Sequence, residues 1–223
     1  MRSKPLLLVI SIVFLVLLID QTIKIWVKTN MYYGEEFSIL GLDWAKIHFV
    51  ENEGMAYGKV IGGKYGKLIL SLFRVGACIG LVFYIKHLIK EKVNTGLIVS
   101  FALILAGALG NILDSAFYGL LFSNSPIHGG AIATMFPEGG GYAPFLYGKV
   151  VDMLHFPMFS GHYPDWMPFV KKGQQFLFFS PVFNIADAAI SVGVFNILLF
   201  QRSFFTKKNP PVTPPPEISE QSQ

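Results

Sequence analysis

Long apolar stretches alternate along this chain with shorter polar segments. Four stretches are almost entirely hydrophobic, at about positions 5–27, 68–85, 95–117 and 181–201. A helix needs about 20 residues to cross the hydrocarbon core of a bilayer, at about 1.5 Å of rise per residue. The pattern therefore predicts four transmembrane helices. Pro181 is expected in the first turn of the last helix, where its missing N–H would have no partner.

Composition supports this prediction. The 223 residues are 52% hydrophobic and 14% charged, with a mean hydropathy of +0.51, whereas an average soluble domain is about 25% charged. These values exclude a disordered chain, a collagen-like fibre and a nucleic-acid-binding module. We expect an all-α membrane protein with four transmembrane helices and a small extracytoplasmic region of strands and loops.

The first apolar stretch resembles a secretory signal, because Arg2 and Lys4 precede it. No small-x-small cleavage pattern follows, and the helical pattern continues through Asp20 and Lys24 to Trp26. We therefore expect this helix to remain in the mature protein.

Basic residues next to the spans predict the orientation of the chain. They lie before the first span, between the second and third, and after the fourth: Arg2, Lys4, Lys86, Lys90, Lys92, Arg202, Lys207 and Lys208. These segments should face the cytoplasm, so both termini lie inside and segments 28–67 and 118–180 lie outside. The proline-rich residues 203–223 are expected to form a disordered cytoplasmic tail.

The outer segments differ in character. Residues 45–57 alternate polar and apolar positions, which predicts a short hairpin-like strand region. Residues 123–148 are rich in Gly, Pro and Ser, which predicts an irregular loop. Residues 164–180 combine aromatic residues with a lysine pair, a composition equally typical of a headgroup-zone segment and of an ordinary amphipathic loop.

Polar residues inside the predicted spans gather toward the outer leaflet. They form pairs that each share one helix face: Asp20 with Lys24, Asn111 with Asp114, and Asn184 with Asp187. Meeting in a bundle, these faces would form an outward-opening polar pocket. Judged only from the depth of each residue in the membrane and from the helical spacing, Asp114 and Asp187 would form the pair at the centre of this pocket. A network that only joins helices is the alternative, and Arg74 fits either the pocket or a snorkelling side chain.

Other kinds of site lack support. The single cysteine, Cys78, excludes a disulfide framework and a CxxC pair. The five histidines lack partners at metal-ligand spacing along the chain, and His155 with His162 is interpreted as loop decoration. We therefore predict no metal and no cofactor.

Five segments of this chain resemble the lipoprotein signal peptidases (signal peptidase II), which are four-span aspartic proteases of bacterial inner membranes. The segments are LIDQTIKIWV, ENEGMAYG, GALGNILDS, GKVVDML and FNIADAAISVG, in the family's order within about residues 5–202. The resemblance implies that residues 1–202 form a peptidase domain, with Asp152 and Asp187 as the catalytic pair. Residues implied to shape the pocket are Asp20, Lys24, Asn52, Gly54, Asn111, Asp114 and Asn184.

The implied substrates are prolipoproteins whose signal peptide is cut before a diacylglyceryl-modified cysteine. The expected partners are these substrates and membrane lipid, with no nucleic acid, and the protein is expected to act as a monomer. Two alternatives stay open at this point. The same carboxylates would serve a small proton- or cation-relaying transporter, and a structural membrane subunit would use the polar faces to hold helices together.

The chain departs from the family pattern in two ways. Ser115 stands where the family has an arginine after the third-helix aspartate, and segments 120–147 and 155–180 are longer than in compact members. A buried carboxylate without a cation is costly. We therefore expect Arg74 to pair with Asp114 or otherwise to take over the missing role.

Overall fold

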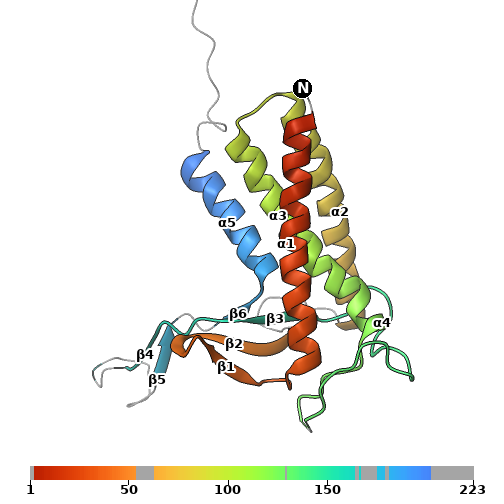
Figure 1. Cartoon of the computed structure of the whole chain (residues 1–223), viewed down its shortest axis with the longest axis vertical. Coiled ribbons are helices and arrows are strands. Elements are labelled where there is room, and N and C mark those ends of the chain that lie inside the picture. The colour runs from red at the N-terminus through yellow and green to blue at the C-terminus, as the bar shows by residue number, and fades with distance from the viewer. Residues whose placement is uncertain are drawn as a thin grey trace, which may run out of the picture.

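The long helices form a bundle, and a small β-sheet lies across one end of it (Figure 1). The computed structural model describes residues 3–53, 63–128, 130–163, 166, 175–178 and 181–201. The long helices are α1 (Ser3–Asn30), α2 (Gly63–Lys90), α3 (Thr95–Leu113) and α5 (Ile185–Phe200). A π-helical turn, η2 (Asp114–Tyr118), and the short α4 (Gly119–Leu121) continue α3 toward the sheet.

The described helices agree in part with the four predicted spans. Three are long and apolar enough to cross a membrane, over Lys4–Asn30, Tyr65–Lys90 and Thr95–Leu121. The fourth, α5, is a shorter apolar helix of 16 residues. Large apolar side chains cover the outside of the bundle: Phe14, Phe73 and Phe195 are each more than 60% exposed. The membrane-protein class is therefore confirmed for this chain.

The predicted start of the last helix is wrong. Pro181 lies outside α5, and the next two residues form the strand β6 (Val182–Phe183). Asn184 ends the extended segment with a capping box, in which its side-chain oxygen accepts the Asp187 N–H at 2.9 Å. In return the Asp187 carboxylate accepts the Asn184 N–H at 3.4 Å. A reciprocal cap starts a helix more strongly than a proline that only tolerates the first turn.

Helices α3 and α5 approach closely because small residues face each other. A Cβ atom on Gly107 would lie 2.1 Å from the Ala186 carbonyl oxygen, and one on Gly193 would lie 2.6 Å from the Ser100 carbonyl oxygen. Small residues at helix contacts let the two backbones pack against each other directly. Such packing matters in a membrane, because the hydrophobic effect does not drive helices together there. This packing brings the start of α5 next to the middle and end of α3.

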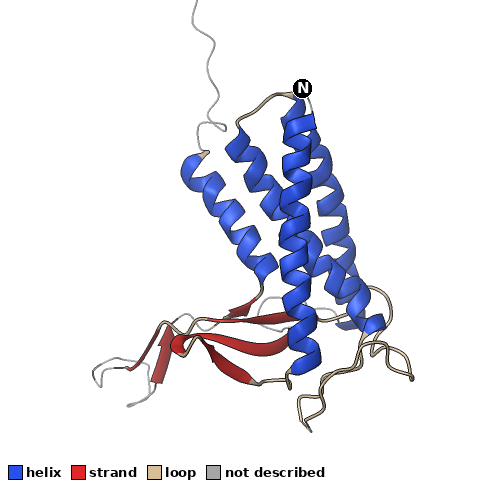
Figure 2. Ribbon diagram, in the orientation of Figure 1, coloured by secondary structure: helices blue, strands red, loops and turns tan. Residues whose placement is uncertain are grey.

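The sheet has strand order β1-β2-β3-β6 and all neighbours are antiparallel (Figure 2). Its further strands are β1 (Glu36–Ile39), β2 (Leu42–Asn52) and β3 (Val150–His155). Strands β4 (Phe159–His162) and β5 (Gln175–Phe178) form a separate pair. The hairpin-like region predicted over residues 45–57 is correct only as a strand: residues 45–52 belong to β2, whose hairpin partner β1 precedes the predicted region, and residues 54–57 lie outside the described residues. In the register of β2 and β3, Val50 faces Asp152, which therefore belongs to the sheet at the end of the bundle.

Other predictions for the outer segments have mixed outcomes. The irregular loop at 123–148 is confirmed in its described residues, which hold a single isolated bridge at Met135. Gly54, most of 164–180 and the tail at 203–223 lie outside the described residues.

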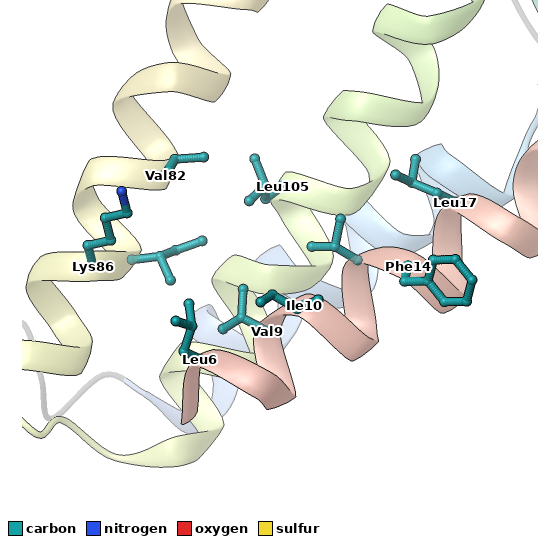
Figure 3. A pocket seen from close by; sticks show the side chains of 10 residues that line it. Leu6, Val9, Ile10, Phe14, Leu17, Val82, Lys86 and Leu105 are labelled. Carbon is teal, nitrogen blue, oxygen red and sulfur yellow. The ribbon is translucent and has the colours of Figure 1, made fainter. Parts of the chain in front are cut away.

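An apolar groove runs between α1, α2 and α3 in the half of the bundle away from the sheet (Figure 3). Leu6, Phe14, Val82 and Leu105 line it, with Lys86 at its edge. Nearly all of its surface is hydrocarbon, as expected for a lipid-facing groove, and the polar side chains described next lie at the other end of the bundle.

Candidate active site

A buried lysine lies at the centre of the polar cluster. The Lys24 ammonium on α1 is 3.0 Å from the Asp20 carboxylate and 2.9 Å from the Asp114 carboxylate. All three side chains are fully buried. A charge removed from water needs close partners to offset its desolvation, and here one cation serves two carboxylates.

Both carboxylates also accept hydrogen bonds from backbone N–H groups of other segments. Asp20 accepts the Ala186 N–H at 2.9 Å, and Asp114 accepts the Val151 N–H at 3.1 Å. Gly110 makes room for Asp20, because a Cβ atom there would lie 2.8 Å from its carboxylate oxygen. The ion cluster therefore joins α1, the end of α3, the first turn of α5 and the strand β3.

Asn111 connects the ion cluster to Asp187. Its side-chain oxygen accepts from Lys24 Nζ at 3.1 Å, so its amide nitrogen faces the other way. That nitrogen donates to Asp187 Oδ1 at 2.8 Å. The position of the Asp187 carboxylate thus depends on Lys24, which orients the Asn111 amide that binds it.

Asn184 contacts both Asp152 and Asp187. Its Nδ2 donates to Asp152 Oδ1 at 2.7 Å and also lies 3.1 Å from Asn111 Oδ1. Its backbone and side-chain oxygen form the capping box with Asp187. The extended residue that starts α5 therefore fixes the two carboxylates relative to each other.

Asp152 is buried at the edge of this arrangement, with 4% of the residue exposed. Burial, together with the charge of Asp187, raises the pKa of its carboxyl to about 7. Hydrogen bonds from Asn184 and Asn52 favour the charged form and only partly offset this. Near neutral pH the Asp152 carboxyl is therefore present in both its protonated and its ionised form.

The structure brings most of the predicted site residues together. Asp20, Lys24 and Asn111 join Asp114, Asn184, Asp152 and Asp187 in one network, and Asn52 reaches Asp152 from β2. Gly54 lies outside the described residues. The pairing of Asp114 with Asp187 from depth and spacing is wrong, because Asp114 turns toward Lys24 while Asp187 turns toward Asn111.

The expected pairing of Arg74 with Asp114 is corrected as well. Lys24 supplies the cation beside Asp114, whereas Arg74 interacts electrostatically with Asp187 and Asp152. Ser115, at the place of the family arginine, donates its hydroxyl to the Asn111 carbonyl oxygen at 3.0 Å. The four-residue spacing in the sequence predicts that Lys24 lies next to Asp20, but it does not predict that Lys24 also contacts Asn111 and Asp114.

Sequence reasoning missed two further parts of the network. Gln21 donates to Asp114 Oδ1 at 2.9 Å and accepts from the Tyr118 hydroxyl at 3.1 Å. Lys28 is fully buried, forms an ion pair with Glu51 and lies 3.0 Å from Ser125 Oγ. The signal for Lys28 was available, since positions 20, 24 and 28 follow each other at four-residue spacing on one helix face.

One prediction about histidines is also wrong. His155 is not loop decoration: it lies on β3 with 9% of the residue exposed, and its ring is 5.5 Å from that of His48. These two residues and Glu36 form a cluster on the sheet that is separate from the carboxylate network.

Comparison with known proteins assigns the family. The profile of the family described as signal peptidase (SPase) II matches residues 12–205. The chain belongs to the signal peptidase II family. A protein named lipoprotein signal peptidase from Porphyromonas gingivalis is 45% identical over 192 residues, which are 86% of this chain and 81% of that one. One of the same name from Amoebophilus asiaticus is 37% identical over 196 residues, or 86% and 77% of the two chains.

Two solved structures have a similar fold. A bacterial membrane enzyme determined by the in meso method has a TM-score of 0.54 and 25% identity, covering 90% of this chain and 94% of its own. A second, at 24% identity and a TM-score of 0.56, shows the same fold. A signal peptidase II is a protease, so the chain is an enzyme, and the comparisons do not support a transporter.

The buried cluster yields a stability prediction. Replacing Lys24 by Met should lower the free energy of unfolding by about 3–5 kcal/mol, because two carboxylates would then be buried without their cation. Thermal unfolding of the purified protein in detergent measures this as a lower Tm. The matched control is Lys90→Met, at the exposed end of α2. Equal Tm values for the two variants would contradict a structural role for the cluster.

Proposed function

We propose that Asp152 and Asp187 are the catalytic pair of an aspartic endopeptidase that removes signal peptides from diacylglyceryl-modified prolipoproteins. The observation that supports this pair is the double contact of Asn184, whose amide binds Asp152 while its backbone and side chain cap the turn bearing Asp187. The names of the relatives point to lipoprotein precursors as substrates. Cleavage would fall just before the lipidated cysteine.

The proposed reaction uses one proton shared by the two carboxyls. The ionised member takes a proton from a water molecule, whose oxygen attacks the scissile carbonyl carbon. The protonated member donates a hydrogen bond to the oxygen on which negative charge develops. When the C–N bond breaks, the amine leaves with a proton returned from the pair, so both carboxyls regain their starting states.

The other polar residues act as positioning residues in this proposal. Lys24 orients Asn111, whose amide donates a hydrogen bond to Asp187. Arg74 provides positive charge near both Asp152 and Asp187. Asn52 lies on β2 next to Asp152, a place from which its amide can also meet the substrate backbone.

We also propose that the sheet end of the bundle faces the outside of a bacterial inner membrane, with both termini in the cytoplasm. The basic residues flanking the spans support this orientation. It suits the proposed substrate as well. The acyl chains of a lipidated precursor stay in the bilayer, while its cleavage site meets polar groups at the outer end of the helices.

Amide substitutions test the catalytic pair. Asp152→Asn and Asp187→Asn should each lower the cleavage rate of a lipidated prolipoprotein by about 10²–10⁴-fold or more, the range for loss of general acid–base catalysis. The double variant should be no slower than either single one, because the two groups act as a unit. A gel-shift assay measures cleavage, and Tm shows that the variants fold. The control is Asp43→Asn, an exposed residue on β2.

Two results would separate this pair from the alternative. Full activity of either Asp152→Asn or Asp187→Asn contradicts the proposal. An inactive but folded Asp114→Asn variant together with an active Asp152→Asn variant would move catalysis to Asp114.

The raised pKa of Asp152 gives a pH prediction. A carboxyl with a pKa of about 7 keeps its proton below that pH and loses it above. The cleavage rate should therefore fall about tenfold per pH unit on the alkaline side. Asn52→Ala removes a hydrogen bond that favours the charged form, so its alkaline limb should move to higher pH. A rate independent of pH through this region would contradict a shared proton.

Cysteine labelling tests the orientation. In a Cys78→Ser background, Gly139→Cys should react with a membrane-impermeant thiol reagent added to intact spheroplasts, whereas Glu91→Cys should react only after permeabilisation. Both positions are exposed, and Gly139 has open space around it. The reverse pattern would place the sheet in the cytoplasm and contradict the proposed site of cleavage.

A further inference from the structure

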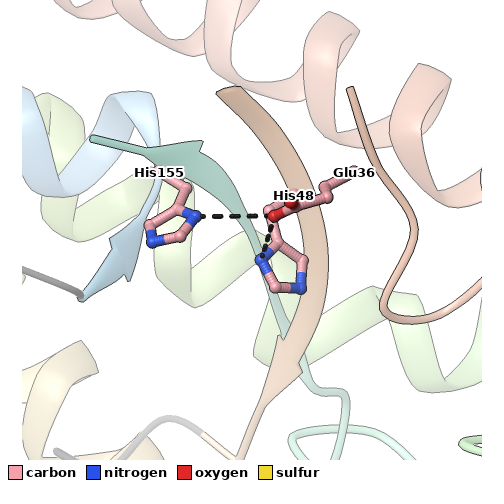
Figure 4. Close-up of side chains that lie close together, drawn as sticks. All are labelled: Glu36, His48 and His155. Atoms are coloured by element: carbon pink, nitrogen blue, oxygen red, sulfur yellow. Dashed lines mark ion pairs between the residues drawn. The ribbon is translucent and has the colours of Figure 1, made fainter. Parts of the chain in front are cut away.

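Three potential metal ligands lie together on one side of the sheet, away from the carboxylate network. They are Glu36 on β1, His48 on β2 and His155 on β3 (Figure 4). The strand registers explain the cluster: Glu36 is directly opposite His48, and His155 is opposite Lys46, two residues from His48 on the same face. Positions two apart on a strand share a face, so three strands bring one ligand each.

The two histidines are short of hydrogen-bond partners. His155 has both ring nitrogens buried without a hydrogen bond among the residues that the structure describes, and His48 Nδ1 is in the same condition. Buried polar atoms in native proteins are nearly always satisfied by protein, water or an ion. Two of these atoms, His48 Nδ1 and His155 Nδ1, lie next to one carboxylate, which indicates that something else completes this cluster.

The carboxylate is oriented toward the histidines. Glu36 uses Oε1 to accept from Lys46 Nζ at 2.8 Å, on the exposed side. Its other oxygen, Oε2, lies 3.4 Å from His48 Nδ1 and 3.7 Å from His155 Nδ1. Lys46 therefore holds the group in place and leaves one oxygen facing both rings, as outer-shell partners of metal ligands do.

These separations fit a small tetrahedral ion. Zinc binds nitrogen and oxygen at about 2.0–2.1 Å, so two ligand atoms on a tetrahedral zinc lie about 3.3–3.4 Å apart. All three ligand atoms lie within 4.8 Å of one another, and the His48 side chain is partly exposed. Imidazole nitrogen favours zinc over calcium or magnesium, which prefer oxygen.

We propose that Glu36, His48 and His155 form a Zn²⁺ site. The ion joins three strands that are otherwise held by backbone hydrogen bonds, and a solvent molecule completes its coordination. Because Asp152 lies three residues before His155 on β3, the ion fixes the strand that bears this carboxylate. The site is distinct from the proposed catalytic pair, so either proposal can fail without the other.

Cobalt absorption tests the site directly. The full-length chain is purified in detergent without a histidine tag, stripped with a chelator and titrated with Co²⁺. One equivalent should give the visible absorption of tetrahedral cobalt, and Zn²⁺ should remove it. Zn²⁺ should also raise the Tm of the stripped protein, since a ligand that binds only the folded state stabilises it.

Single substitutions then identify the ligands. His48→Gln and Glu36→Gln should each weaken binding by more than about 10-fold, because even an outer-shell partner is worth about 10–100-fold. His155→Gln should do the same. His128→Gln, at an exposed histidine of the outer loop, is the matched control and should bind as the wild type does.

Two results would overturn the proposal. One is the absence of saturable cobalt absorption in the wild-type protein. The other is unchanged affinity in both His48→Gln and Glu36→Gln. If His155→Gln fails to fold, these two more exposed positions and the effect of Zn²⁺ on Tm still decide the question.

Discussion

The ion cluster of Lys24 with Asp20 and Asp114 is the interaction on which the rest of the site depends. Inside a bilayer the charges have no water to return to, so each must be met by a partner or by a backbone group. Their partners come from α1, α3, β3 and the first turn of α5. Helix packing and sheet position are thus coupled through one ammonium group.

This coupling explains how a strand carries one of the two proposed catalytic carboxylates. Asp187 belongs to a helix, whereas Asp152 belongs to a sheet that lies across the end of the bundle. The Val151 N–H binds Asp114, and the adjacent Asp152 carboxylate binds Asn184. Neighbouring residues on β3 therefore contact the ion cluster and the proposed catalytic pair. This fixes the position of the catalytic pair relative to the ion cluster.

Several features of this chain could be predicted from the sequence because they depend on local patterns. Apolar length marked the membrane helices, and three- or four-residue spacing placed Asp20 with Lys24 and Asn111 with Asp114. The same patterns gave a wrong partner for Asp187, because depth in a helix does not say which way a side chain turns. Only the resemblance to a family pointed to Asp152, which belongs to no apolar stretch.

Sequence by itself determined the membrane class, the helix faces that carry polar groups and the family of the chain. Tertiary structure decided which of those groups meet: Lys24 rather than Arg74 beside Asp114, and Asn184 between Asp152 and Asp187. It also joined Glu36, His48 and His155, which are far apart along the chain. The physical reason is that periodicity fixes neighbours within one element, whereas strand register and helix packing fix neighbours between elements.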